Sequence, residues 1–229
     1  MPRYVESTVQ AIAQDYLRDK YRRKARRRRI YSDIEVRTKP KFGGKRADGF
    51  LAFDHWLWGT YVVSMEAKSF KTIPAMTPKV DSRLFLFNCL RAGFIISLLT
   101  GTLFVFLNGS ATSTELYLPL AVLVSGGMAY GILTRKSFSH KVVDVIKQVR
   151  QYPANEYWLA FSQDSLDSLK DERVEHLVEI SRNLGIGILV VKPGGRVVER
   201  IKARRKWKMF GDYLRFYSVE QKVRKKLVA

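Results

Sequence analysis

Two charged side chains alternate with apolar ones in the segment YVVSMEAKSF, residues 61–70. Successive side chains of a strand point to opposite faces, so Glu66 and Lys68 share one face, while Met65 and Ala67 share the other. A carboxylate and an ammonium on one face of an apolar strand indicate either an ion pair on a solvated face or a reactive site.

A second carboxylate stands upstream in the segment GGKRADGFLAF, where Asp48 begins a predicted strand. Asp48 and Glu66 would lie on adjacent antiparallel strands, so their carboxylates can converge. Two carboxylates and a backbone carbonyl are hard oxygen ligands that suit Mg²⁺ (or Mn²⁺) with several waters retained. Lys68 could then polarise a water or stabilise charge on a phosphate. The alternative is that Asp48 is only a turn residue before Gly49.

The elements that must position these residues follow a mixed α/β pattern. Helical spacing of apolar residues or strand-like runs predict, in order, a helix at 5–24, strands at 30–36, 49–53 and 61–67, a helix at 140–152, a strand at 156–162, a helix at 165–184, and strands at 186–191 and 196–201. Gly185 suits the end of the last helix. We therefore expect an α-β-β-β-α-β-α-β-β domain, interrupted after its third strand.

The interruption consists of two apolar segments, 84–107 and 116–133. As helices they would be roughly 36 Å and 27 Å long, close to what a bilayer requires. Arg91 in the first segment can snorkel toward an interface. The connector 108–115 has no Lys or Arg, whereas the outer flanks carry Lys79, Arg83, Arg135 and Lys136. The positive-inside rule then places both termini in the cytoplasm. Two buried core helices are the alternative.

These patterns divide the chain into four expected parts: 1–83 and 135–201 as the two halves of one domain, 84–134 as a transmembrane helical hairpin, and 202–229 as a basic, aromatic tail. The small residues of 125–127 suit close helix packing and make a homo-oligomer an expectation. The single cysteine, Cys89, excludes an internal disulfide. We find no cleavable signal peptide, P-loop, GxSxG motif or zinc cluster in the sequence.

The charge balance favours a polyanionic partner. The chain carries 41 Lys and Arg against 21 Asp and Glu, a formal charge of +20, which fits nucleic acid or an anionic membrane face. The tail adds Trp207, Phe210, Tyr213, Phe216 and Tyr217, which could stack on bases or lie at a lipid interface. The residues that we expect to contact nucleic acid are Arg22, Arg23, Lys24, Arg26, Arg27, Arg28, Arg29, Lys45 and Arg46.

Asp48 followed by Glu66-Ala67-Lys68 resembles the D…ExK signature of the PD-(D/E)XK nuclease superfamily, which has the restriction-endonuclease-like fold. The element order is similar as well. The resemblance implies that a glutamate of the first helix, Glu6, joins the metal ligands Asp48 and Glu66, with Glu35 as a competitor. Gln148 and Tyr152 are similar to the Gln-x-x-x-Tyr motif of RecB-like members, although an amphipathic helix also explains them.

Two departures from the family pattern stand out: Ala47 replaces the usual proline, and the hairpin separates the third strand from the next helix. The resemblance implies catalytic roles for Asp48, Glu66, Lys68, Glu6, Gln148 and Tyr152. The resulting hypothesis is a membrane-anchored Mg²⁺-dependent nuclease at the cytoplasmic face, with DNA the favoured substrate and defence against incoming DNA a hypothetical role. The alternatives are an inactive nuclease-fold protein that binds nucleic acid or scaffolds partners, and an oligomeric membrane effector or channel.

Overall fold

The structure is a computed structural model that describes residues 4–25, 29–55, 59–108, 117–135, 137, 141–206 and 212–228. The chain divides into two compact units. One contains Met1–Thr77 and Val143–Ala229, and the other contains Pro78–Val142. Over the described residues the protein is mixed α/β, with a six-stranded sheet and eight α-helices. The predicted fold class is confirmed at this coarse level.

The sheet combines an antiparallel half with a parallel half. Its order is β1-β2-β3-β6-β7-β8. β1, β2 and β3 form an antiparallel meander, β3, β6 and β7 run parallel, and β8 is antiparallel to β7. The strands are β1 (Ile30–Arg37), β2 (Arg46–His55), β3 (Gly59–Lys68), β6 (Glu156–Ser162), β7 (Gly187–Val191) and β8 (Val197–Ile201). The central strands β3, β6 and β7 are buried almost throughout, as their continuous apolar runs require.

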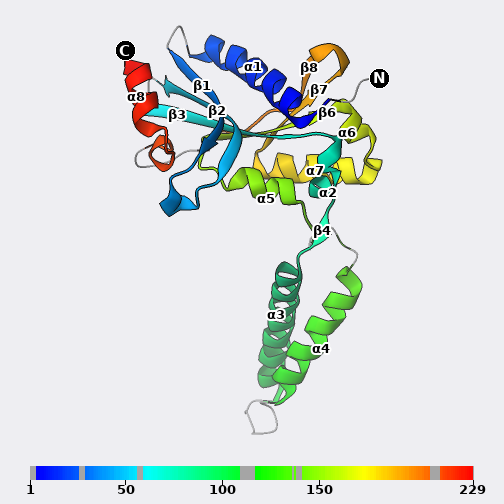
Figure 1. The fold of residues 1–229 in the computed structure, drawn as a ribbon. Coiled ribbons are helices and arrows are strands. Elements are labelled where there is room, and N and C mark those ends of the chain that lie inside the picture. The colour runs from blue at the N-terminus through cyan, green and yellow to red at the C-terminus, as the bar shows by residue number, and fades with distance from the viewer. Residues whose placement is uncertain are drawn as a thin grey trace. The chain divides into compact units, whose positions relative to one another are not determined.

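Helices cover both faces of this sheet (Figure 1). α1 (Glu6–Lys24) packs a stripe of Val9, Ala13, Leu17 and Tyr21 on one face. The opposite face is covered by α5 (Asp144–Arg150), α6 (Gln163–Asp167), α7 (Asp171–Leu184) and α8 (Glu220–Val228), with the short α2 (Ile73–Met76) beside α5. The unit therefore has two hydrophobic cores, one on each side of the sheet.

Two predicted helices differ from the observed ones. Residues 140–152 were expected to be one helix. Of the described residues 141–152 only Asp144–Arg150 is helical, because Lys141–Val142 (β5) pairs with Lys79–Val80 (β4) in a two-stranded sheet. The helix expected at 165–184 is split into α6 and α7. Ser168 Oγ donates to the Asp164 carbonyl at the end of α6, and the extended Lys170 starts α7, whose first turn is acidic.

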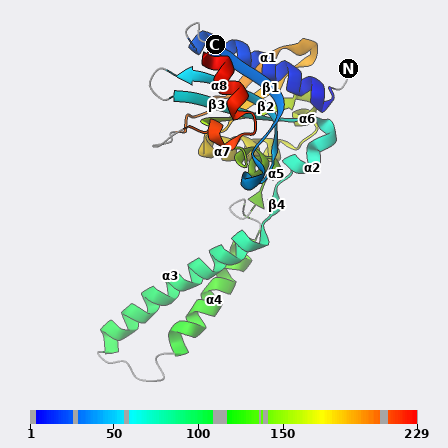
Figure 2. The same cartoon turned by 60° about the vertical axis from the view of Figure 1, so that its left-hand side comes forward.

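The C-terminal residues are part of the first unit and its core. Leu214, Tyr217 and Val223 are buried, and the Tyr217 hydroxyl donates to the Pro153 carbonyl over 3.0 Å. Figures 1 and 2 both show α8 beside β1. The interpretation of Tyr217 as a base-stacking residue is therefore wrong. Trp207 and Phe210 lie outside the described residues.

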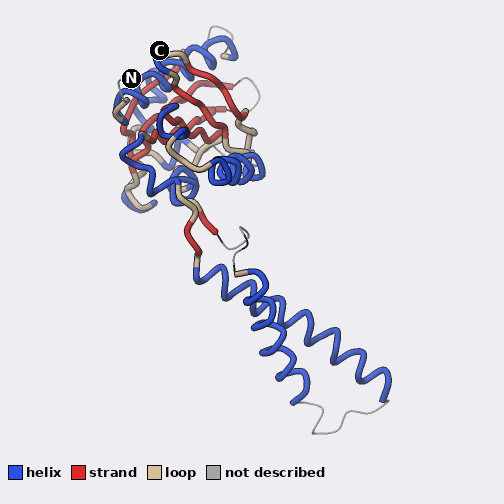
Figure 3. The backbone as a smooth tube through the Cα atoms, turned by 90° about the vertical axis from the view of Figure 1, so that its right-hand side faces the viewer, coloured by secondary structure: helices blue, strands red, loops and turns tan. Residues whose placement is uncertain are grey.

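The second unit contains two long apolar helices, α3 (Ser82–Asn108) and α4 (Tyr117–Thr134), which run side by side (Figure 3). By length and composition both could cross a membrane. The candidate spans are Ser82–Leu107 and Tyr117–Thr134, and only 11% of the 18-residue apolar window in each is buried. A core helix of a soluble protein would be mostly buried, so this exposure favours the membrane interpretation over the core alternative.

Candidate functional site

The candidate site lies where the backbone pairing between β2 and β3 ends. Paired residues of these strands run from His55–Gly59 to Gly49–Met65, and no pair follows at Asp48. Here Asp48 Oδ2 accepts a hydrogen bond from the Ala67 amide over 2.9 Å, so a side chain replaces the backbone acceptor. The aspartate is thereby held against the end of β3.

Two glutamines of α1 fix the backbone around Asp48. Gln10 Nε2 donates to the Asp48 carbonyl over 2.6 Å, and Gln14 Nε2 donates to the Phe50 carbonyl over 2.8 Å. Gly49 permits this approach, because a Cβ there would lie 2.4 Å from Gln14 Oε1. Sequence reasoning missed both glutamines, although their spacing of four residues on the apolar face of a helix is a usable signal.

Glu66 and Lys68 project from β3 as a buried ion pair. Glu66 is 0% exposed, and its Oε1 accepts a hydrogen bond from Lys68 Nζ over 2.7 Å. Lys68 Nζ also contacts Glu6 Oε1 over 3.5 Å. The second oxygen of Glu66, Oε2, is buried and has no hydrogen-bond partner among the described residues. Leaving a buried carboxylate oxygen unpaired is costly, so it needs an explanation.

The protonation behaviour of the three groups follows from their burial. Burial and the Asp48 carboxylate together raise the pKa of Glu66 to about 7, against the opposing effect of Lys68. Burial also raises the pKa of Asp48, while the Ala67 amide and Lys68 oppose the rise. Burial alone would lower the pKa of Lys68, but the surrounding carboxylates raise it. Two buried carboxylates that resist joint ionisation are a place where a cation is favourable.

Gln148 and Tyr152 approach the same carboxylates from α5 and the residues that follow it. Tyr152 is 2% exposed. Burial raises the pKa of its hydroxyl, the Glu66 carboxylate raises it further, and its hydrogen bond with Gln148 lowers it. Tyr152 therefore lies near enough to Glu66 and Gln148 for both to affect the pKa of its hydroxyl. Direct side-chain contacts join Glu6 to Lys68 and Lys68 to Glu66, and the carboxylate of Asp48 affects the pKa of Glu66.

Glu35 is placed elsewhere. Its backbone has a φ of 57°, and its exposed carboxylate pairs with Arg46 over 3.5 Å. Of the two competing glutamates, Glu6 is therefore the one that contacts the site, through Lys68.

The described residues contain no group of three or more His, Cys, Asp and Glu side chains that could hold a metal ion. Glu6 contacts Lys68 and does not converge with the other two carboxylates as the expected ligand set of Asp48, Glu66 and Glu6 requires. The remaining candidate donors are the carboxylates of Asp48 and Glu66. The Oε2 atom of Glu66 is buried and has no hydrogen-bond partner among the described residues. Two carboxylates supplemented by water form a donor set that fits Mg²⁺ or Mn²⁺.

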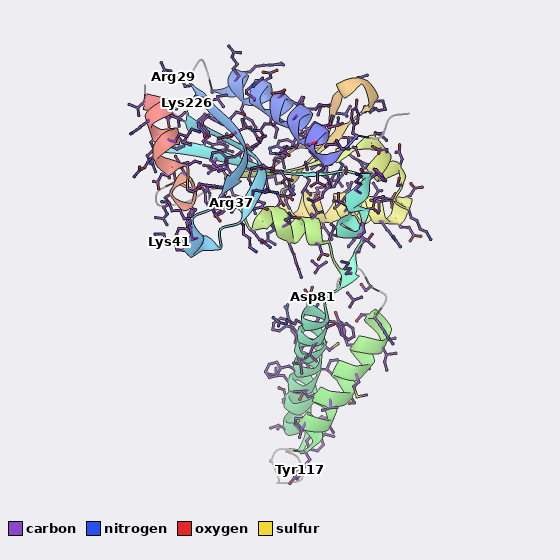
Figure 4. All side chains as sticks on the ribbon, in the orientation of Figure 1. Arg29, Arg37, Lys41, Asp81, Tyr117 and Lys226 are labelled. Atoms are coloured by element: carbon purple, nitrogen blue, oxygen red, sulfur yellow. The ribbon has the colours of Figure 1, made fainter. Side chains whose placement is uncertain are left out.

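The described residues of the basic run lie away from these carboxylates. Arg22 and Arg23 are exposed at the last turns of α1, roughly 24 Å along the helix from Glu6. Arg29 is also exposed, and Figure 4 shows it at the same end of the sheet as Lys226. The Lys24 side chain and Arg26, Arg27 and Arg28 lie outside the described residues. Lys45 and Arg46 are exposed and adjoin Asp48 in the chain.

A second buried carboxylate, not anticipated from the sequence, lies at the start of β6. Glu156 is 4% exposed, its Oε1 accepts from the Tyr61 hydroxyl over 2.7 Å, and its Oε2 accepts from the Tyr21 hydroxyl. Trp158 Nε1 donates to the Tyr21 oxygen over 3.0 Å. The two tyrosines are 135 and 95 residues away in the chain, and no local pattern connects them to Glu156.

No family model, curated protein or solved structure matches the chain.

Proposed function

We propose that the chain is a metal-dependent nuclease of the PD-(D/E)XK type that cleaves phosphodiester bonds of nucleic acid, with DNA the favoured substrate. The observation that carries the proposal is the buried Glu66, which has one oxygen paired with Lys68 and the other unpaired, beside Asp48 on the adjoining strand. Asp164 and Glu199 also have one buried unpaired oxygen among the described residues, so the proposal depends on the combination of that oxygen with the neighbouring Asp48 carboxylate and the Lys68 ammonium.

Asp48 and Glu66 would hold Mg²⁺ or Mn²⁺. When bound, the cation supplies Lewis-acid stabilisation of negative charge on the phosphate. Its charge also favours ionised carboxylates, which relieves the repulsion that raises the pKa of Glu66. The hydrogen bonds from Ala67 to Asp48 and from Gln10 to the Asp48 backbone hold the first ligand in place before the cation arrives.

Lys68 is the group that we assign to the substrate. Its ammonium is positive at neutral pH, because the neighbouring carboxylates raise its pKa. It can donate to a phosphate oxygen or to the attacking water. Tyr152 and Gln148 are positioning residues that restrain Glu66, and Glu6 restrains Lys68.

The nuclease would be anchored in a lipid bilayer through α3 and α4. Lys79 precedes α3, Arg83 lies in its first turn and Arg135 follows α4, whereas the segment that joins the helices has no basic residue. This asymmetry supports a cytoplasmic location for both termini and for the nuclease unit. A nuclease at this position would meet DNA that enters through the membrane, which supports a defence role. Unchanged phage infection and plasmid uptake after deletion of the gene would count against that role.

The test is a cleavage assay with the full chain purified in detergent. Plasmid, linear duplex DNA, single-stranded DNA and RNA are each incubated with Mg²⁺, Mn²⁺ or EDTA. We expect metal-dependent cleavage that falls at least about 100-fold in Glu66→Gln and in Lys68→Ala. Glu35→Gln is the matched control, since this glutamate is exposed and pairs only with Arg46 among the contacts that the structure describes.

Wild-type protein that binds nucleic acid in all metal conditions and cleaves none of the four substrates would overturn the nuclease proposal. It would favour the alternative of a catalytically inactive protein that binds nucleic acid or scaffolds partners. Cleavage that survives in both site variants would assign activity to a contaminant or to another part of the chain.

A further inference from the structure

A large groove runs between the two helices of the hairpin, with a volume of about 1180 Å³. This exceeds the range of roughly 300–1,000 Å³ that is usual for small-molecule sites. Its walls come from both helices and are almost entirely apolar, whereas one end is polar. Representative lining residues are Phe85 and Leu90 of α3, Val124 and Met128 of α4, and Ser82 and Arg135 at the polar end.

Glycines on α4 create the groove by allowing the two helix backbones to approach each other. A Cβ on Gly127 would lie 3.0 Å from the Cys89 carbonyl oxygen, and one on Gly131 would lie 3.1 Å from Cys89 Sγ. On α3, a Cβ on Gly93 would lie 2.3 Å from the Leu123 carbonyl oxygen. The larger side chains on either side of these close backbone approaches remain exposed and form the walls of the groove.

The same contacts weaken the case for a second copy of the chain as the occupant. The small residues of 125–127 suggested a homo-oligomer, but Gly126 and Gly127 face Ile96 and Cys89 of the same chain. Ser125 Oγ donates to the Ala121 carbonyl of its own helix over 2.8 Å. The small-residue motif is thus used within the hairpin and is not available to dock another hairpin.

The polar end selects an anionic ligand. Arg135 follows the last residue of α4, lines the groove and is exposed. A guanidinium binds phosphate oxygens in a bidentate manner, and basic pockets between spanning helices on the cytoplasmic side are suited to anionic lipid headgroups. An elongated apolar groove with a cation at one end fits a molecule with a hydrocarbon tail and a phosphate.

We propose that this groove binds an anionic phospholipid, with its phosphate at Arg135 and an acyl chain along Leu90, Val124 and Met128. The inference rests on the proposed insertion of α3 and α4 into a bilayer. It is independent of catalysis, because no residue of the groove belongs to the carboxylate site.

The test is native mass spectrometry of the full chain in detergent, with phosphatidylglycerol and phosphatidylcholine of identical acyl chains at equal concentrations. We expect adducts that favour phosphatidylglycerol. Arg135→Gln should weaken the phosphatidylglycerol adduct roughly tenfold, because it removes a charge-assisted hydrogen bond. Met128→Trp should fill the groove and abolish adducts of both lipids. Arg91→Gln and Leu120→Trp are the matched controls, since both residues are exposed on the same two helices outside the lining.

Equal adducts of the two lipids, or adducts unchanged in Arg135→Gln, would overturn the assignment of the phosphate. A dimer that is present in the wild type and lost in Met128→Trp would assign the groove to a second copy and overturn the lipid proposal. Flotation with vesicles distinguishes failure of the lipid site from failure of membrane insertion. Protein that floats but retains no lipid refutes only the lipid site, whereas protein that does not float refutes insertion itself.

Discussion

Two buried glutamates of the same sheet differ in how their carboxylate oxygens are hydrogen-bonded. Glu156, at the start of β6 on the face covered by α1, has each carboxylate oxygen bonded to a tyrosine hydroxyl. Glu66, near the end of β3 on the opposite face, has one oxygen bonded to Lys68 and the other unbonded. Both are almost fully buried, so burial alone does not distinguish them.

This difference in hydrogen bonding indicates a structural role for Glu156 and a functional role for Glu66. The Glu156 network joins α1, β3 and β6. Both carboxylate oxygens accept from tyrosine hydroxyls, and Arg205 Nε donates to the Tyr61 oxygen over 3.2 Å, so Glu156 is satisfied without a ligand. At Glu66 one carboxylate oxygen has no hydrogen-bond partner among the described residues. Burial and the Asp48 carboxylate together raise the pKa of Glu66 to about 7.

Asp164 and Glu199 also have a buried oxygen without a hydrogen-bond partner among the described residues, so the unpaired oxygen is not distinctive by itself. What sets Glu66 apart is the second carboxylate, Asp48, whose charge helps to raise the Glu66 pKa, and this pairing points to function.

The largest expected effect comes from breaking the complete network. Glu156→Ala leaves the Tyr21 and Tyr61 hydroxyls buried without their acceptor, at about 1–3 kcal/mol each. We expect a loss of about 4 kcal/mol in the free energy of unfolding and a fall in Tm of about 10 °C. The measurement is fluorescence-detected thermal unfolding of the detergent-purified chain. Tyr21→Phe, which removes one of the two donors, is the control and should cost less; a cost as large as that of Glu156→Ala would contradict this account.

The sequence allowed the polar pairs of β2 and β3 to be predicted because they depend on local rules. Strict alternation placed Glu66 and Lys68 on one face, and the antiparallel meander placed Asp48 beside them. Helical periodicity predicted Gln148 and Tyr152 on one helical face, but only Gln148 lies in α5, and Tyr152 follows two residues after its end. These inferences need only neighbouring strands or a single helix.

What could not be predicted depends on partners distant in the chain. Glu156 accepts a hydrogen bond from Tyr21 only because α1 packs across the sheet. The contact between Glu6 and Lys68 depends on the same packing of α1. The basic, aromatic composition of the C-terminal residues indicated an exposed tail, yet Tyr217 is 0% exposed. Composition does not reveal which aromatic residues a neighbouring sheet will bury.

The second expected effect concerns pH. The pKa of Glu66 is about 7 in the folded state and 4.5 in a model peptide, so the folded state binds an extra proton between these values. Its stability must therefore fall as pH rises from about 4.5 to 7, by about 3 kcal/mol in total, and then remain level with respect to this group. We expect this decline in the wild type in EDTA and its absence in Glu66→Gln. Thermal unfolding at pH 5, 6, 7 and 8 measures it, and parallel curves for the two proteins would refute the raised pKa.

A smaller effect is expected from Mg²⁺, which sharpens the comparison between the two glutamates. Binding at Asp48 and Glu66 should stabilise the wild type at pH 8 by about 1.4 kcal/mol at ten times its Kd. Glu66→Gln should lose this stabilisation, whereas Glu156→Gln should start from a lower Tm and show the same rise with added Mg²⁺. The readout is Tm against Mg²⁺ concentration and does not depend on cleavage. An equal rise in Tm in Glu66→Gln would place the cation elsewhere.

The smallest effect tests the place of Glu6. Its carboxylate side chain is 36% exposed and contacts Lys68 over 3.5 Å, whereas Lys68 bonds Glu66 over 2.7 Å. A half-exposed ion pair contributes up to about 1 kcal/mol, so Glu6→Gln should slow cleavage by about fivefold at most. Glu35→Gln should leave the rate unchanged. The ratio of kcat/KM to the wild type, measured at saturating Mg²⁺, decides between two roles. A loss of about 100-fold in Glu6→Gln, relieved by raising the Mg²⁺ concentration, would make Glu6 a third metal ligand that moves from Lys68 to the cation when the site is loaded.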